Sequence, residues 1–387
     1  DGHSFRRIDN LEIDATGSVS FDSDSLMVIG SLAVSGQGAS TFAVGGAVTV
    51  NIIDADTITY LRDVTVADAA SVTLASEDNS VIGAIAGAIQ IATKTNEAEE
   101  EQNEGEQDNS KKNVTSASVG ASVAVGMIGG SARSFIDSSS VSSAGDVTLT
   151  AESKSWIFTF SIAGSAAGAD TDSGASAGGG GKGANAAAVA LAGAGSYSEV
   201  SRTIVSSIGN GSYIATTAPY DVVVVAQDDS LIVGNAGAVG LARGSGGQKG
   251  IAASLGASVV VNVVSNTVQA YTLDSILDVG GRLDQIAESS AAVSAFALGG
   301  FGAIGSGDEK AATGLGLAGG ASGAVNIVTN TVESFLYDNN PGSASPVSVG
   351  DGILLEAEND ALVIANAFLL GAGIAQGGKS GYGVALG

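Results

Sequence analysis

The chain has 387 residues, among them 57 glycines, 3 prolines, one histidine and no cysteine. Without cysteine there can be no disulfide framework and no thiolate metal site, and the single histidine, His3, leaves no basis for a histidine-centred catalytic site. The net charge of −25 disfavours binding to nucleic acid or to anionic membranes, whereas 44% apolar residues and a mean hydropathy of +0.32 indicate a folded chain.

Residues 1–46 form a partial leading repeat, and from residue 47 to residue 387 the chain repeats itself. The first recurring motif is Ala47-Val48-Thr49-Val50-Asn51. In its later copies, Val50 corresponds to Val125, Leu191, Val261 and Val325, at separations of 75, 66, 70 and 64 residues. We therefore place the starts of five repeats near residues 47, 122, 188, 258 and 323.

A second motif follows the first, at an interval of 24 residues in the first two repeats. It is typified by Val147-Thr148-Leu149-Thr150-Ala151-Glu152, with further copies at 72–74, 222–227 and 353–358 and a weaker one at 286–288. Apolar residues alternate over short stretches such as 156–162, and Gly, Asn or Asp mark the turns. This is the period of β-strands, and no segment sustains a helical period.

These patterns predict an all-β chain that folds as a β-solenoid, or parallel β-helix, of about five imperfect repeats of 64–75 residues. Small side chains should fill its narrow interior. Gly130 stands where later copies have Asn266 and Asn330, an exchange that predicts a left-handed bend. If each repeat makes two or three coils, the segment is a rod roughly 50–80 Å long.

A polar, usually glycine-rich insertion precedes each return of the first motif, and we expect these insertions to project as loops from one edge of the solenoid. They cover residues 95–113, 169–185, 243–250, 305–314 and 377–383. The insertion at 95–113 contains seven acids in the twelve residues from Glu97 to Asp108. Such a block repels itself and is typical of a solvated loop, although it could also attract divalent cations loosely.

Each of these loops carries a lysine. The five are Lys112, Lys182, Lys249, Lys310 and Lys379, at separations of 70, 67, 61 and 69 residues. One interpretation is a basic row that binds anionic cell-surface glycans or lipopolysaccharide. The simpler interpretation is that solvated loops need some charge.

Three Asp-x-Asp pairs are candidate calcium ligands, because calcium binds carboxylate and carbonyl oxygens. They are Asp22 with Asp24, Asp54 with Asp56, and Asp170 with Asp172. No complete calcium-binding loop motif surrounds them, and a turn carboxylate that bonds its own backbone is the simpler interpretation. Calcium is the only cofactor that the sequence suggests.

The sequence does not favour an enzyme. Many parallel β-helices act on polysaccharides, and such chemistry needs carboxylates with an Arg or Lys on one face. Asp228-Asp229 and Glu356/Glu358 follow the second motif, but at positions that correspond between repeats, which predicts a surface ladder. Uncharged runs such as 250–273 have strand and turn composition, so no membrane insertion is expected.

The segments Gly145 to Glu152 and Asn266 to Tyr271, together with the Gly/Ala-rich tracts, resemble repeats of very large bacterial filamentous adhesins and leukotoxin-type exoproteins. The resemblance implies a β-helical stalk that is secreted or displayed on the bacterial surface, and it carries over no catalytic residue. The leading hypothesis is therefore a non-catalytic adhesin segment that presents loops for attachment to cell surfaces or matrix.

Two alternatives stay open. The first is a subunit of an extracellular fibre or sheath that stacks end to end through unpaired strand edges, so that its partners are other copies or further repeats of the same protein. The second is a polysaccharide-active β-helix enzyme.

Overall fold

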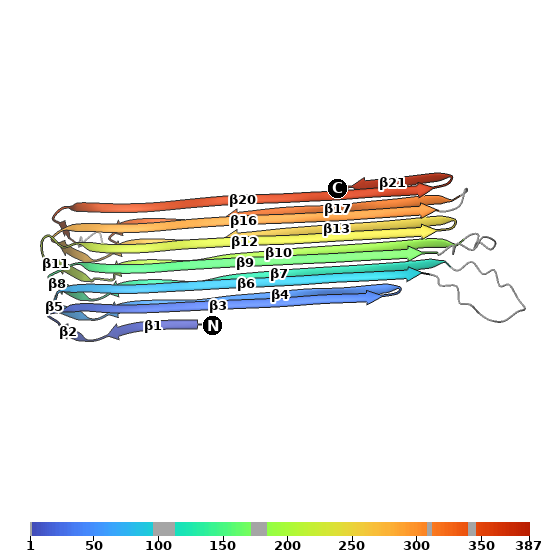
Figure 1. Ribbon diagram of the computed structural model, residues 1–387. Coiled ribbons are helices and arrows are strands. Elements are labelled where there is room, and N and C mark those ends of the chain that lie inside the picture. The colour runs from blue at the N-terminus through green and yellow to red at the C-terminus, as the bar shows by residue number, and fades with distance from the viewer. Residues whose placement is uncertain (1, 96–112, 172–183, 308–311, 340–345) are drawn as a thin grey trace, which may run out of the picture.

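The computed structural model describes residues 2–95, 113–171, 184–307, 312–339 and 346–387. Within these ranges the chain forms strands β1 to β21 and no helix. All strand pairs are parallel, and the strands lie in three sheets that run through the stack (Figure 1). The predicted all-β parallel solenoid is confirmed.

The three sheets are named here in the order in which the chain visits them. Sheet A contains β1 (Gly2–Asp9), β4 (Phe42–Arg62), β7 (Val114–Asp137), β10 (Asn185–Gly209), β13 (Lys249–Val264), β14 (Thr267–Leu273), β17 (Thr313–Val328), β18 (Thr331–Tyr337) and β21 (Ser380–Leu386). Sheet B contains β2 (Glu12–Asp14), β5 (Thr65–Ala69), β8 (Ser140–Ser143), β11 (Tyr213–Thr216), β15 (Ile276–Val279) and β19 (Val347–Val349). Sheet C contains β3 (Ser18–Ala39), β6 (Ser71–Thr95), β9 (Val147–Asp170), β12 (Val222–Gly246), β16 (Arg282–Gly307) and β20 (Gly352–Gly377).

One repeat makes one coil, because the chain passes through each sheet once before it returns. The coils are β1–β3 (coil 1), β4–β6 (coil 2), β7–β9 (coil 3), β10–β12 (coil 4), β13–β16 (coil 5) and β17–β20 (coil 6), after which β21 begins another. The sequence left the number of coils per repeat open, and the condition of two or three coils behind the length estimate is not met. Strands of up to 26 residues span about 80 Å, whereas coils stack at about 4.8 Å, so the long dimension runs along the strands.

The register of sheet A corrects one alignment of the first motif. Val50 pairs with Val125, as expected, but Val125 pairs with Tyr197 and not with Leu191. Tyr197 then pairs with Val261, and Val261 with Val325. The segment around Leu191 is rich in Ala and Gly, so it resembles the motif without occupying its position.

The second motif is aligned as the sequence predicts. Val72, Val147 and Val222 stack on one another, and Val222 continues to Leu283 and Ile353. Because sheet C keeps this register through six strands without a shift, its columns of side chains can be followed from coil 1 to coil 6.

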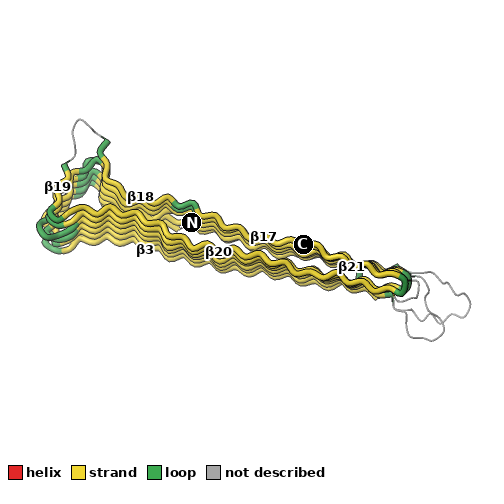
Figure 2. The backbone as a smooth tube through the Cα atoms, turned by 90° about the horizontal axis from the view of Figure 1, so that it is seen from above, coloured by secondary structure: helices red, strands yellow, loops and turns green. Residues whose placement is uncertain are grey.

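Each coil has two parts, which Figure 2 shows from above. In the head, sheets A, B and C enclose a roughly triangular interior. In the flat section, sheets A and C face each other directly. The head holds the large core residues, such as Leu61, Leu74, Ile136 and Leu149, all of them fully buried.

Next to the head, the interior of the flat section still holds large buried residues such as Ile82, Ile128 and Ile157. Further toward its far end the interior is filled mainly by alanine, serine and glycine, and its two apolar clusters there consist of alanines with three larger residues, Val114, Val260 and Phe301. The two sheets approach so closely that a Cβ atom on Gly120 would lie 2.6 Å from the Gly164 carbonyl oxygen, and one on Gly244 would lie 2.1 Å from that of Ile251. The predicted small-residue interior is confirmed for this part of the flat section.

The corner between sheets A and B has left-handed backbone in coil after coil. Asn10, Asp63, Ser138, Asn210 and Asp274 occupy it with φ between 48° and 54°. Four of the five are Asn or Asp, the residue types other than Gly that tolerate this conformation best. The bend predicted at Gly130 does have a positive φ of 105°, but Asn266 and Asn330 do not share it. They lie at the breaks β13/β14 and β17/β18, and their side chains bond along the stack instead.

The far end of the flat section is the edge from which the predicted loops leave. The chain passes from sheet C to the next strand of sheet A there in every coil, so the termini of all five predicted loops lie along one edge (Figure 2). This confirms their common position. Most of 95–113 and 169–185, including the acidic block, falls outside the described residues.

Candidate functional site

The strongest concentration of charge in the described part of the chain lies on the outer face of sheet C, at the head. One column of stacked residues runs through Asp24, Glu77, Glu152, Gln227, Glu288 and Glu358. A second column, two residues further along each strand, runs through Leu26, Asn79, Lys154, Asp229, Ser290 and Asp360. We call the acids Glu77, Glu152, Asp229, Glu288, Glu358 and Asp360 the carboxylate ladder.

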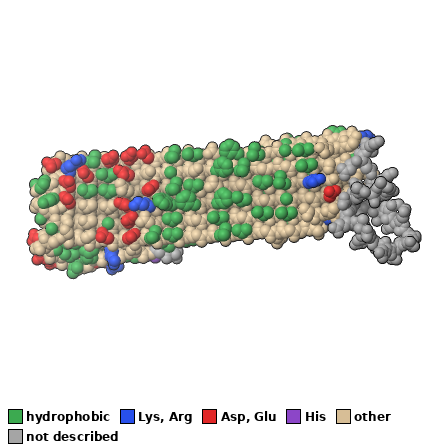
Figure 3. All heavy atoms as spheres, viewed as in Figure 1, with side chains coloured by type: hydrophobic (Ala, Val, Ile, Leu, Met, Phe, Trp, Pro, Cys, Tyr) green, Lys and Arg blue, Asp and Glu red, His purple; other side chains and the backbone are tan. Residues whose placement is uncertain are grey.

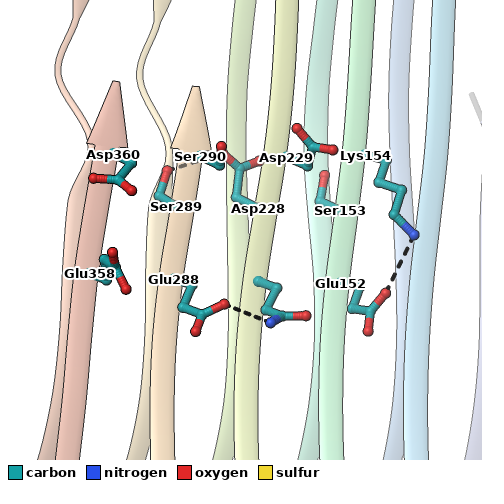
Figure 4. A pocket seen from close by; sticks show the side chains of 11 residues that line it. Glu152, Ser153, Lys154, Asp228, Asp229, Glu288, Ser289, Ser290, Glu358 and Asp360 are labelled. Atoms are coloured by element: carbon teal, nitrogen blue, oxygen red, sulfur yellow. Dashed lines mark hydrogen bonds and ion pairs between the residues drawn. The ribbon is translucent and has the colours of Figure 1, made fainter. Parts of the chain in front are cut away.

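The upper part of the ladder lines an open groove of about 440 Å³ (Figure 4). Lys154 bridges two of its acids, with Nζ 3.3 Å from Glu77 Oε1 and 3.6 Å from Glu152 Oε2. Gln227 Nε2 donates to Glu288 Oε2 at 2.7 Å. Gln227 therefore interrupts the first column, which is otherwise a continuous stack of acids, and Lys154 offsets part of its charge from the neighbouring column.

The pKa values follow from these contacts. The hydrogen bond from Asn79, with the help of Lys154, lowers the pKa of Glu77, and the bond to Glu77 raises the pKa of Lys154. Repulsion from Asp360 raises the pKa of Glu358. The groove attracts cations through its field, yet no group of three or more His, Asp or Glu among the described residues is arranged to hold a metal ion.

Beneath the groove, a buried ion pair crosses the interior where the head meets the flat section. Arg202 of coil 4 forms it with Asp78 of coil 2, and both side chains are fully buried. The Arg202 guanidinium also donates to the carbonyl oxygens of Ala55, at 3.2 Å, and Gly129, and to Ser153 Oγ at 3.3 Å. Burial lowers the pKa of Arg202, and the Asp78 carboxylate opposes this effect.

A second buried carboxylate continues this polar belt upward. Asp228 Oδ2 accepts from Asn266 Nδ2 at 2.7 Å and from Ser289 Oγ at 3.2 Å, and Asp228 Oδ1 accepts from Ser230 Oγ at 3.0 Å. Asn330 extends the belt, because its Nδ2 donates to Ser289 Oγ at 2.8 Å and its Oδ1 accepts from the Asn266 backbone at 3.0 Å. Burial raises the pKa of Asp228 to about 6 despite these bonds.

The candidate calcium ligands do not come together. Asp22 and Asp24 point outward from β3 in sheet C, and Asp54 and Asp56 point outward from β4 in sheet A, so the two pairs lie on opposite faces. Both pairs are within strands, which corrects the expectation that they sit in turns. Asp56 accepts from Ser131 Oγ at 2.7 Å and lies 3.6 Å from His3 Nδ1. Asp170 ends β9, and Asp172 lies outside the described residues.

Two of the five predicted loop lysines can be placed. Lys249 begins β13 and Lys379 precedes β21, both exposed at the loop edge and two coils apart. In the register of sheet A, Lys249 stacks with Thr313, and Thr313 stacks with Ser380. Lys249 and Lys379 therefore do not lie in the same column of residues. Lys112, Lys182 and Lys310 lie outside the described residues.

Sequence reasoning missed Arg202 and misjudged Asp228. Asp228 stacks with Ser289 and Asn359, not with Glu356 or Glu358, and it points inward while Asp229 points outward. Arg202 pairs with Gly130 and lies in the column of Asn266. The sequence alignment placed the third copy of the first motif at Leu191, six residues before Tyr197, its true position. With the correct alignment, Arg202 would have been recognised as an arginine at an inward-facing position.

No protein-family model, no curated protein and no solved structure matches the chain. What is established is therefore the class of fold, a parallel β-solenoid with one long coil per repeat. Among the described residues, no helix is both long and apolar enough to span a membrane.

Proposed function

We propose that this chain is a non-catalytic structural segment of a very large extracellular bacterial adhesin, which carries loops for attachment to cell surfaces or matrix. One observation carries the proposal: the chain leaves sheet C and re-enters sheet A at the same edge in every coil. Insertions of different length therefore occupy one line along the stack, while the register of sheet C is undisturbed. A scaffold that tolerates variable loops at a fixed edge suits presentation of those loops.

A loop-replacement experiment tests the attachment role. Residues 96–112 and 172–183 are each replaced by a short Gly-Ser linker, and adhesion of protein-coated beads to cultured cells and to matrix glycans is measured. The proposal expects adhesion to fall at least tenfold while far-UV circular dichroism stays unchanged. The matched control replaces 340–345, which connects β18 to β19 at the head. Equal adhesion by all variants would refute the role of the loop edge.

A second candidate function, end-to-end assembly into an extracellular fibre, is favoured by the upper surface of coil 6. Ile353 is 50% exposed and Leu355 is 45% exposed, whereas Val222 and Val224, their equivalents two coils below, are fully buried. Strands β20 and β21 also present their upper edges. Another coil of the same kind, from a second copy or from further repeats, would cover these side chains and pair with these edges.

Electron microscopy distinguishes the two candidates. End-to-end assembly expects filaments whose length grows with protein concentration, and it expects Ile353→Lys with Leu355→Lys to abolish them. Adhesion without filaments would support only the stalk.

A further inference from the structure

The outer face of sheet C is broadly apolar along the flat section (Figure 3). In coil 3, Trp156, Phe158, Phe160 and Ile162 all point outward and are 40–43% exposed. The same face carries further exposed apolar side chains in every other coil: Leu32, Val34, Ile85, Ile89, Ile91, Val239, Leu241, Phe296, Leu362, Ile364, Phe368 and Leu370. Glycine and a few polar residues such as Ser294 and Asn366 lie between these side chains, and an exposed apolar surface of this extent is typical of an interaction site.

The size and shape of the face suit a second sheet. The apolar positions cover about twelve residues of each of six strands, which is roughly 40 Å by 29 Å, or on the order of 1,100 Å² per copy. Two such faces in contact would bury about 2,200 Å² in total, above the usual size of a stable protein interface of about 1,600 Å². Flat sheets pack face to face in this way in β-sandwiches.

Charges at the two ends of the face select one arrangement. In coil 4, Asp229 lies at the head end and Arg243 at the loop end, with outward positions 231 to 241 uncharged between them. In coil 3 the signs are reversed, since Lys154 stacks directly with Asp229 and Asp170 lies at the loop end. Coils 5 and 6 have Ile304 and Ile374 at the position of Arg243.

A two-fold axis parallel to the stacking direction and passing over residue 236 pairs the two opposite charges of coil 4. Rotation about this axis places each coil opposite the same coil of the other copy, with the strands running in opposite directions. Arg243 of each copy then faces Asp229 of the other copy, which gives two such pairs per dimer. In coil 3 the same operation places Lys154 of one copy opposite Gly168 of the other and Asp170 opposite Glu152, so coil 3 adds no ion pair of its own. A two-fold axis along the strands would instead bring the two carboxylate ladders together, which like-charge repulsion opposes.

We infer that a second copy of this chain docks on the apolar face of sheet C in this two-fold arrangement, held in register by Asp229–Arg243 ion pairs. Within one copy, in the part of the chain that the structure describes, neither Asp229 nor Arg243 makes an ion pair. The inference is independent of the proposed function, because it concerns side-by-side pairing and not the loops or the open ends.

A charge-reversal cycle measured by analytical ultracentrifugation tests the pairing. The parent chain is expected to be a dimer, and Asp229→Arg or Arg243→Asp alone should weaken the dimer at least tenfold. The double variant should return to within about threefold of the parent. Asp360→Arg is the matched control, since it makes the same change in the same column but faces Ile374 of the other copy, and its effect should be several-fold smaller.

Distances between spin labels on single cysteines give a readout that does not depend on these charges. A label at residue 235, beside the axis, should lie less than about 20 Å from its counterpart, and a label at residue 290 should lie about 46 Å from its own. A monomer, single reversals without effect, or a short distance at residue 290 would overturn the inference. So would a monomer that floats with phosphatidylcholine vesicles, since lipid and not a second copy would then cover the face.

Discussion

Replacement of Arg202 by methionine should destabilise the chain more than any surface change, because it leaves the Asp78 carboxylate buried without its partner. Asp78 would retain only the bonds from Thr57, at 3.2 Å, and Ser80, at 2.7 Å. Removal of one member of a buried ion pair costs about 3–5 kcal/mol, and we expect Arg202→Met to fall in this range.

The double variant Asp78→Asn with Arg202→Met isolates the contribution of the pair. With no charge left in the interior, the double variant should recover at least half of the loss, because an uncharged belt avoids most of the desolvation cost. Arg282→Met is the control, since Arg282 lies 3.2 Å from Asp284 but is 49% exposed, and it should cost no more than about 1 kcal/mol.

The assay is guanidinium-induced unfolding followed by far-UV circular dichroism, with the midpoint and slope fitted for each variant. The result that refutes this reasoning is a cost below about 1 kcal/mol for Arg202→Met, or costs that simply add in the double variant. Either result would mean that solvent reaches Asp78 and that the belt is not a closed interior network.

Three further perturbations test other parts of the fold. Asp228 has a pKa of about 6 in the folded chain against a reference value of 3.8, so the native state binds this proton more tightly than the unfolded state does. The free energy of unfolding should therefore fall by about 3 kcal/mol as the pH rises from about 4 to above 6. In urea titrations, Asp228→Asn should flatten this change. Gly130→Ala should lower the free energy of unfolding by about 2 kcal/mol or more, since φ is 105° and the new Cβ would lie 2.0 Å from the Ala55 carbonyl oxygen. Gly83 is the control, because a Cβ there would meet open space, and Gly83→Ala should change the free energy of unfolding by no more than about 0.5 kcal/mol in the same titrations. Ser207→Phe should raise the midpoint of thermal unfolding. Ser207 lies between Phe135 and Tyr271 in a column of stacked residues, and in that column Tyr60 with Phe135 and Tyr271 with Phe335 already stack with ring centroids 4.8 Å apart. An unchanged or lower midpoint would show that the site cannot admit a ring.

Much of the solenoid could be predicted because its long strands repeat a motif with strand periodicity. The second motif predicted the correct register of sheet C in coils 2 to 6, since Val147, Val222 and Ile353 recur with the same acid or amide five residues later. The first motif failed at one copy, because a small-residue core makes Ala/Gly segments interchangeable in sequence. That single misalignment concealed Arg202, the residue on which the interior polar belt depends.

The number of coils per repeat could not be predicted for a related reason. Alternation of apolar and polar residues reveals a strand but not where a long strand has to turn, and here strands of about 24 residues continue past several glycines that serve close packing and not turns. Gly120, for instance, lies in the middle of β7 against the Gly164 carbonyl of the facing sheet. Counted as turns, such glycines suggest short strands and several coils.

The alternation also misleads about which side of the strand is the inside. In 156–162 the large residues Trp156, Phe158 and Phe160 point outward, while the inward positions between them include Thr159 and Ser161. Inside, these hydroxyls pair across the two sheets, as in Ser122 with Ser161 at 2.7 Å and Ser118 with Ser165 at 2.6 Å.

Beyond the isoleucine cluster next to the head, glycine, alanine and serine therefore let the two sheets of the flat section meet, and the large side chains there lie on the outer surface because little interior volume is left for them. The light composition of the chain and the apolar side chains exposed on the outer faces of both sheet A and sheet C are two consequences of one geometry. A thin slab of this kind removes little of its own apolar surface from water, so association of slabs through the face of sheet C supplies burial that the interior does not. The charges at Asp229 and Arg243 matter in this setting because a flat apolar face alone fixes no orientation, and two ion pairs per dimer would.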